Sequence, residues 1–266
     1  LKLKYSITEG TKVRINEPPK KEMRGHLDLK YIYKNKRNWT YGTNLKRSSD
    51  KSYLSKYKLS EGESVLNQNI FSEWGSLYKN ISLDLFKFQS LSDEYLVSNL
   101  PFIRPSITFV SNNLYDKNRN RNRSFKISFN SVARKNNKDV DSIHFQSTND
   151  KSYIYNGLLL KDFSSFNIDT YNKNGTSNNK SLIKFFPKLG FEAQYPLIDY
   201  SNNSSFLIEP KVQFFISPDD YYNNKIRNED SLELDLTSSN LFNHDRYSGN
   251  DRSESGTILN YGILLK

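Results

Sequence analysis

Apolar and polar residues alternate one by one along much of this chain. In the cleanest run every second position is apolar: Leu189, Phe191, Ala193, Tyr195 and Leu197. Successive side chains of a β-strand point to opposite faces, so a period of two predicts a strand with one apolar and one polar face. No stretch shows sustained helical periodicity. The pattern therefore predicts an all-β chain.

The alternation recurs from end to end and predicts about a dozen strands of roughly ten residues each. Two alternating runs flank the turn-like segment 35–38, which predicts a hairpin there. No linker divides the chain, so residues 1–266 are predicted to form part of one domain with one continuous sheet. The predicted strands include residues 27–33, 39–45, 81–88, 103–109, 125–129, 153–159, 166–168, 189–197, 206–216, 232–236 and 259–265.

The predicted connections are of two sizes. Some are tight, as at 35–38, and others are long and hydrophilic. Outer-membrane barrels alternate short turns with long loops in this way, whereas a soluble sandwich needs more apolar core per strand. The long connections are predicted at residues 48–64, 112–123, 172–180, 218–230 and 240–255.

Composition favours a membrane barrel among all-β folds. Only 35% of the residues are hydrophobic and the mean hydropathy is −0.77, which leaves little material for a soluble core. Aromatic residues nevertheless reach 14%. That content argues against disorder and suits strands with lipid on one face and water on the other. No run approaches the roughly 18 apolar residues of a membrane helix. The predicted fold class is an antiparallel transmembrane β-barrel.

The two ends of the chain suggest a fragment of a larger barrel. A membrane sheet must close, because an open edge leaves backbone groups unpaired in hydrocarbon. The last alternating run stops at Lys266 without a terminal aromatic residue, and no signal segment precedes Leu1. We therefore expect the closing strands to lie outside this sequence.

The net charge of +10 at pH 7 raises the question of an anionic partner. Lys and Arg are spread along the chain beside many Asn and Ser, so nucleic acid is not favoured. A basic interior or rim that meets a phosphorylated glycolipid is the better interpretation. Cysteine is absent, which excludes disulfides and thiolate metal sites.

Few residues suggest catalysis, and we predict no enzyme activity, no cofactor and no metal. The three histidines, His26, His144 and His244, show no ligand spacing and are expected to be exposed or to face the lumen. The acidic pairs at 219–220 and 229–230 suggest either a divalent cation or, as we favour, simple loop solvation. There is no G-x-S-x-G elbow and no Gly-rich phosphate loop.

Proline donates no hydrogen bond to a sheet, so its positions are informative. We expect the prolines to mark strand ends and bends. The alternative is that they weaken pairing at a seam between strands. The residues concerned are Pro101, Pro105, Pro187, Pro196, Pro210 and Pro218.

The most distinctive segment is Asn240-Leu-Phe-Asn-His-Asp-Arg-Tyr-Ser-Gly-Asn-Asp-Arg252, which lies between two alternating runs and is predicted to be an ordered loop. Asp245, Arg246, Asp251 and Arg252 are expected to form ion pairs that fix this loop, either inside the lumen or capping it. Ser248 lies near His244 in sequence, but adjacency does not orient a catalytic base, so no active site is predicted. Loss of either arginine is expected to impair barrel assembly more than binding.

This segment resembles the "LF…(N/D)RFSG-DR" signature of the LptD family, the LPS-assembly outer-membrane proteins also called organic solvent tolerance proteins. The matching positions are Leu241, Phe242, Asp245, Arg246, Tyr247, Ser248, Gly249, Asp251 and Arg252. Other short segments match the family in its own order over about residues 23 to 262. Their positions are Arg24, Gly25, Trp39, Gly42, Asp50, Tyr53, Leu54, Pro101, Glu209, Pro210, Asp230 and Ser231.

The resemblance implies the central part of the C-terminal barrel domain of a protein that inserts lipopolysaccharide into the outer leaflet of the Gram-negative outer membrane. It implies as partners lipopolysaccharide, an LptE-like lipoprotein plug, periplasmic LPS-transport bridge proteins and outer-membrane lipid. The family's N-terminal periplasmic jelly-roll domain has no recognisable counterpart in these 266 residues. Neither gate strands nor the disulfides of some family members can be assigned to this chain.

Two other functions fit the same alternation. One is a different outer-membrane barrel, such as a porin-like channel or nutrient receptor. The other is a secreted β-sandwich that binds sugars. Heat-modifiable migration in the membrane fraction separates a barrel from a sandwich, and co-purification of a small lipoprotein separates the LptD function from a porin.

Overall fold

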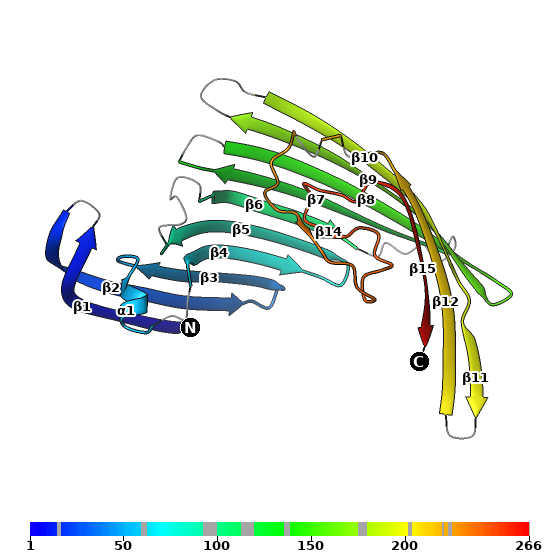
Figure 1. Cartoon of the computed structure of the whole chain (residues 1–266), viewed down its shortest axis with the longest axis horizontal. Helices are drawn as coiled ribbons and strands as arrows, with labels where there is room; N and C mark the ends of the chain where they lie inside the picture. The colour runs from blue at the N-terminus through cyan, green and yellow to red at the C-terminus, as the bar shows by residue number, and fades with distance from the viewer. Residues whose placement is uncertain are drawn as a thin grey trace. The chain divides into compact units, whose positions relative to one another are not determined.

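Strands make up most of the chain in the computed structural model (Figure 1). The structure describes residues 1–14, 17–59, 63–92, 100–112, 120–135, 139–174, 180–201, 204–219, 221–222 and 225–265. No described helix is long and apolar enough to cross a membrane. The elements are β1 (Lys2–Arg14), β2 (Glu17–Lys34), β3 (Trp39–Ser48), α1 (Tyr53–Lys56), β4 (Val65–Gly75), β5 (Lys79–Ser90), β6 (Phe102–Ser111), β7 (Arg121–Ala133), β8 (Asp139–Tyr155), β9 (Leu158–Asn174), β10 (Lys180–Gln194), β11 (Leu197–Ser201), β12 (Ser204–Ser217), β13 (Leu232–Glu233), β14 (Tyr247–Ser248) and β15 (Gly256–Leu265).

The strands form one large sheet in which neighbours follow chain order. The order runs from β1 to β10 and then to β12, which pairs with both β11 and β15. Among the described residues the two ends of this sheet do not pair, so the sheet stays open. The prediction of an all-β, antiparallel, partial barrel is confirmed, as is the estimate of about a dozen strands, because the sheet contains 13. Short β13 and β14 pair only with each other.

The side chains of β10 show how the two faces of the sheet differ. Ile183, Phe185 and Leu189 are exposed, Phe185 to 58%, whereas the alternating Lys184 and Lys188 are buried. A soluble sheet buries its apolar face and exposes its polar one, so this exposure is inverted. Such an inversion is characteristic of a barrel wall whose outer side meets lipid.

Strands β10 and β11 are one long strand with a single break. Leu189 pairs with Ile216 and Leu197 with Ile208, which is the same register on both sides of the break. Pro196 lies at the break because it has no N–H to donate to β12. The hairpin to β12 therefore extends over both labelled strands.

Proline positions agree only in part with the prediction that they mark strand boundaries. Pro101, Pro196 and Pro218 do lie next to strand ends, but Pro105, Pro187 and Pro210 lie inside strands and so do not mark strand ends. Pro210 shows why an interior proline is tolerated. Its carbonyl still accepts the Tyr195 N–H at 3.1 Å, so only one of the two bonds of that pair is lost.

Several connections differ from those predicted. The predicted strand 153–159 is instead the end of β8, a two-residue turn and the start of β9. Asn156 and Gly157 both have positive φ, 48° and 81°, as a two-residue hairpin turn requires. The strands β1 and β4 were not predicted.

The predicted strand 232–236 is also wrong, since only Leu232 and Glu233 form a strand, outside the large sheet. As a result, the two predicted loops 218–230 and 240–255 are one connection, residues 218–255. The turn at 35–38 is confirmed, with the Asn35 side chain accepting the Arg37 and Trp39 N–H groups. Within the other predicted loops, residues 60–62, 113–119 and 175–179 lie outside the described residues, as does Asp220.

Two compact units can be separated by their internal contacts. The first comprises residues 1–109, 128–143 and 172–181, and the second comprises 110–127, 144–171 and 182–266. In the first unit, α1 packs on the sheet through a small apolar cluster of Tyr53, Leu54 and Leu66. The second unit contains the long connection 218–255.

Candidate functional site

The connection 218–255, which we call the strap, leaves β12 and returns to β15. Ser217 pairs with Gly256, so the strap begins and ends at neighbouring positions of one hairpin. Between these points it lies against the polar face of the second unit, and its described residues contact β7, β9, β10 and β12. The long loop is therefore bound to the sheet around residues 242–251.

Lysine and glutamine side chains of the sheet bind the strap near residues 242–245. The buried Lys188 ammonium donates to the carbonyl oxygen of His244 at 2.7 Å and pairs with the Asp245 carboxylate at 3.2 Å. The Gln213 amide donates to the carbonyl oxygen of Phe242 at 2.9 Å. Burying a lysine is costly unless its charge is matched by hydrogen bonds and a counter-ion. The strap supplies both to Lys188.

Aromatic contacts accompany these polar ones. The His244 ring lies 3.8 Å from the Phe163 ring and 5.5 Å from the Phe215 ring, centroid to centroid. Burial lowers the pKa of His244, and the nearby Lys161 lowers it further. The Lys211 ammonium lies 4.8 Å from the centre of the Phe242 ring. His244 is therefore a packing residue that favours its neutral form.

Two aspartates organise the second part of the strap. The Asp230 carboxylate accepts the N–H groups of Asn250 at 3.0 Å and Asp251 at 3.1 Å. The Asp251 carboxylate in turn accepts the N–H groups of Glu229 at 2.7 Å and Asp230 at 3.2 Å. These reciprocal bonds join the segments around residues 230 and 250 as a pair of mutual caps.

Asn250 and Asp251 connect the strap to β7 and β9, respectively. Asp251 accepts the Tyr171 hydroxyl at 3.0 Å, and the Lys126 ammonium donates to the Asn250 side chain at 2.9 Å. Burial opposes ionisation of Asp230, but its N–H donors outweigh this and lower its pKa. Burial and the charge of Asp230 raise the pKa of Asp251. The pair therefore favours one ionised carboxylate at position 230.

The signature residues do not pair with one another as the sequence predicted. Asp245 pairs with Lys188, and Arg246 pairs with Glu254 at 2.6 Å. The Arg252 guanidinium donates to the carbonyl oxygen of Ile226 at 2.9 Å. The prediction of an ion-pair cluster among the four charged side chains is wrong, because their partners are elsewhere in the strap, in β9 and in β10.

The remaining signature residues have structural partners. Tyr247 and Ser248 form β14, and the Ser248 hydroxyl bonds to the carbonyl oxygen of Leu232 at 3.3 Å. Gly249 lies at φ 87°. Leu241 and Phe242 lie beside Gly262 of β15, at an ordinary contact distance from the position of an added Cβ.

We expect Arg252→Ala to lower the yield of folded protein more than Arg246→Ala. The Ile226 carbonyl is buried and would lose its donor, which costs about 1–2 kcal/mol. Arg246 is 33% exposed, so its loss is expected to cost about 1 kcal/mol at most. The measurement is the fraction with folded, heat-modifiable migration, with the half-exposed Arg227→Ala as control. Normal folded levels with defective function would contradict this assignment.

Other sequence positions come together in the first unit. The Arg24 guanidinium binds the Asp50 carboxylate through two bonds, of 2.9 and 2.7 Å, and Tyr53 and Leu54 lie beside them in α1. Gly25 and Gly42 lie where a side chain would collide with a neighbouring strand. The structure does not bring Trp39, Pro101, Glu209 or Pro210 into this cluster or the strap, and Asp230 and Ser231 belong to the strap.

Two of the histidines differ from the prediction, since His244 packs against Phe163 and Phe215. His144 is buried and contacts Asp169 at 3.0 Å, so it is neither exposed nor free to face an open lumen. His26 bonds with Ser6 at 2.6 Å. The described residues contain no group of three His, Asp or Glu side chains arranged to hold a metal ion. The pairing of His144 depends on strand register, which local sequence does not reveal.

Comparison with known proteins identifies one family. Residues 32–264 match the model of the LptD family, LPS transport system D. No curated protein matches the chain. The matched residues include the whole strap, and every predicted family position except Arg24 and Gly25.

Proposed function

Because this chain belongs to the LptD family of the LPS transport system, we propose that it is an outer-membrane β-barrel component that inserts lipopolysaccharide into the outer leaflet. The observation that carries the proposal is the family match over residues 32–264, which spans both the strap and the strands that it contacts. The inverted faces of the sheet support it, because an apolar outer face and a charged inner face suit a barrel wall. Transport, and not catalysis, is the proposed role.

The proposed partners follow from the two faces. The apolar face meets outer-membrane lipid, and the polar face meets the sugar-rich part of lipopolysaccharide and an LptE-like lipoprotein plug. Periplasmic bridge proteins deliver the glycolipid. The strap contributes by covering part of the polar face and neutralising the buried Lys188. Its role in this proposal is structural.

Depletion of the protein in its own bacterium tests the proposal. Newly made lipopolysaccharide is expected to disappear from the cell surface and to accumulate inside the outer membrane, as measured by surface labelling of intact cells. Re-expression of the wild-type protein is expected to restore labelling. Unchanged surface lipopolysaccharide together with altered uptake of small solutes would instead indicate a porin-like channel.

Purification from the membrane provides a second measurement. A small lipoprotein is expected to co-purify with the full-length protein in detergent. A barrel that purifies alone and leaves lipopolysaccharide export intact when deleted would contradict the proposal.

A further inference from the structure

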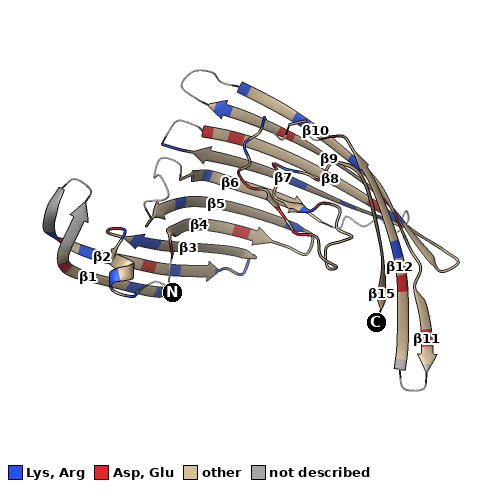
Figure 2. Cartoon of the chain, viewed as in Figure 1, with Lys and Arg blue, Asp and Glu red and all other residues tan. Residues whose placement is uncertain are grey.

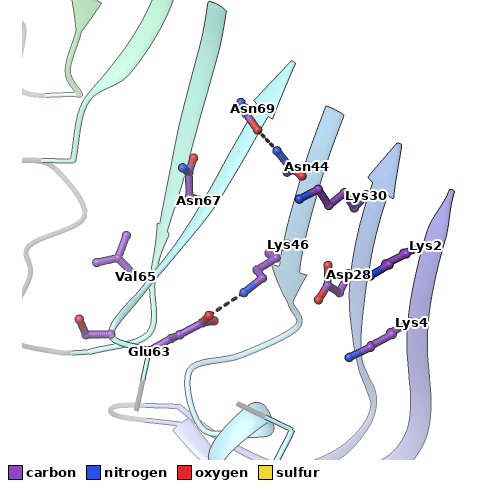
Figure 3. Close-up of a pocket in the computed structure, with 11 residues that line it drawn as sticks. Lys2, Lys4, Asp28, Lys30, Asn44, Lys46, Glu63, Val65, Asn67 and Asn69 are labelled. Atoms are coloured by element: carbon purple, nitrogen blue, oxygen red, sulfur yellow. Dashed lines mark hydrogen bonds and ion pairs between the residues drawn. The ribbon is translucent and has the colours of Figure 1, made fainter. Parts of the chain in front are cut away.

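The first unit contains a basic cavity on the polar face of β1 to β4 (Figure 3). Its volume is about 750 Å³. The side chains of Lys2, Lys4, Lys30 and Lys46 project from the same side of three neighbouring strands. Figure 2 shows basic residues on these strands, as on other strands of the chain. The other lining residues are Asp28, Asn44, Glu63, Ser64, Val65, Asn67 and Asn69.

Strand register places these lysines close together. Lys2 is directly opposite Lys30, and Asp28 lies between Lys4 on one side and Lys46 on the other. Like charges directly opposite each other on neighbouring strands destabilise a sheet. The pairing of Lys2 with Lys30 is therefore a cost to folding that packing of this chain does not explain.

Few carboxylates compensate the positive charge. Lys46 pairs with Glu63 at 2.6 Å, in a contact where both side chains are more than a third exposed. No described carboxylate oxygen lies within 4.0 Å of the ammonium groups of Lys2, Lys4 or Lys30. The cavity lining thus has four lysines against two acidic residues. Its net charge is positive.

The strap offers an internal comparison for such lysines. Lys188, also on a polar face, is buried and receives a carbonyl oxygen and a carboxylate from the chain itself. Lys2, Lys4 and Lys30 are exposed and receive no such partner from the described chain. A polar face whose lysines remain open in this way is suited to an external anion.

We propose that this cavity binds the phosphate groups of the transported glycolipid. Lysine acts as a point charge toward phosphate, and neighbouring strands about 4.8 Å apart bring several such charges into one cavity. Asn44, Asn67 and Asn69 add amide groups that suit sugar hydroxyls. This inference rests on the proposed function and names the part of the ligand that the site contacts.

The exposure of these lysines suits a transported ligand, which must be released after it binds. Exposed charge pairs each contribute little, because water and salt screen them. A conducting site must attract its ligand without holding it tightly. Several weak contacts in one cavity meet both conditions.

The test uses the full-length protein, purified in detergent with any lipoprotein partner, and measures equilibrium binding of lipopolysaccharide. The test variant is Lys2→Gln with Lys4→Gln and Lys30→Gln. The control is Lys36→Gln with Lys56→Gln and Lys79→Gln, which removes the same charge from exposed positions outside the cavity. We expect about tenfold weaker binding for the test variant and less than about twofold for the control.

The chemistry of the ligand is tested with dephosphorylated lipopolysaccharide. Wild-type protein is expected to bind it about as weakly as the test variant binds the native glycolipid. Equal binding by wild type and test variant would overturn the inference while leaving the proposed function intact. Equally tight binding of pyrophosphate and of the glycolipid by the wild-type protein would also overturn the inference, because the cavity would then be a site for free phosphate. Normal export after depletion would instead overturn the proposed function.

A single substitution guards against misfolding. Lys30→Gln removes the repulsion with Lys2, so the β1–β2 amides are expected to exchange hydrogen at the wild-type rate or more slowly. The same variant is expected to bind lipopolysaccharide roughly twofold more weakly. Faster exchange or unchanged binding would assign Lys30 a merely structural role.

Discussion

Replacing Gly249 by alanine is expected to release the strap from the sheet. Gly249 has φ 87°, where an alanine costs about 1–2 kcal/mol. Its added Cβ would also collide with the backbone carbonyl of Asp230 and lie 2.7 Å from the Asp230 carboxylate. That carboxylate accepts the N–H groups of Asn250 and Asp251, so its displacement breaks both bonds. We expect a total loss of about 3 kcal/mol in the stability of the strap.

Hydrogen exchange at the Asn250 and Asp251 amides measures this loss. A loss of about 3 kcal/mol corresponds to roughly a hundredfold faster exchange. Gly256→Ala is the matched control, because Gly256 has φ 91° but no atom within 4 Å of the added Cβ. In Gly256→Ala the protection from exchange is expected to fall only about tenfold. Gly75→Ala, also in open space but without positive φ, sets the baseline. Equal losses at 249 and 256 would contradict a role for the Asp230 contact.

The second large effect is expected for Arg24→Ala. The Arg24 side chain is 2% exposed and that of Asp50 is 11% exposed, and two hydrogen bonds join them. Burial opposes ionisation of Asp50, but the bonds from Arg24, Ser49 and Ser52 outweigh it and hold its pKa well below the ordinary value. Removal of the arginine leaves a nearly buried carboxylate without its cation. The expected cost is about 3 kcal/mol.

The amides of α1 report this effect, because Asp50 accepts the Ser52 N–H just before the helix. Their hydrogen exchange is expected to be about a hundredfold faster in Arg24→Ala. Arg47→Ala is the control, since Arg47 is an exposed arginine of the neighbouring strand β3. Arg24→Lys is expected to recover only part of the protection, because lysine cannot form two parallel bonds. Unchanged exchange in Arg24→Ala would show that Tyr53 and Leu54 alone hold the helix.

The successes and errors of sequence interpretation have a common cause. Alternation in 189–197 correctly predicted a strand, because side-chain direction along a strand depends only on local geometry. Alternation in 232–236 was misleading, because the same pattern occurs in the strap, where no sheet strand pairs with it. The turn at Asn156 and Gly157 was missed, although Asn-Gly between apolar runs is a strong local signal for a hairpin.

The candidate site shows the same division. The segment 240–252 could be recognised from its sequence as an ordered loop and as a family signature. The partners of its charged residues could not be recognised, since Lys188 is more than fifty residues from Asp245 in the sequence. The sequence indicated the basic cavity only in general terms, through the net positive charge of the chain. Its lysines come together because β1, β2 and β3 pair in one particular register.

The sequence by itself determined the all-β class, the two unlike faces of the strands and the membership of a transport family, because these depend on local periodicity and short motifs. Only the tertiary structure decided that the strap lies against the polar face, that Asp230 and Asp251 cap each other, and that Lys2 faces Lys30. The reason is physical. Each of these contacts depends on strand register and chain return, which long-range pairing sets and no local pattern encodes.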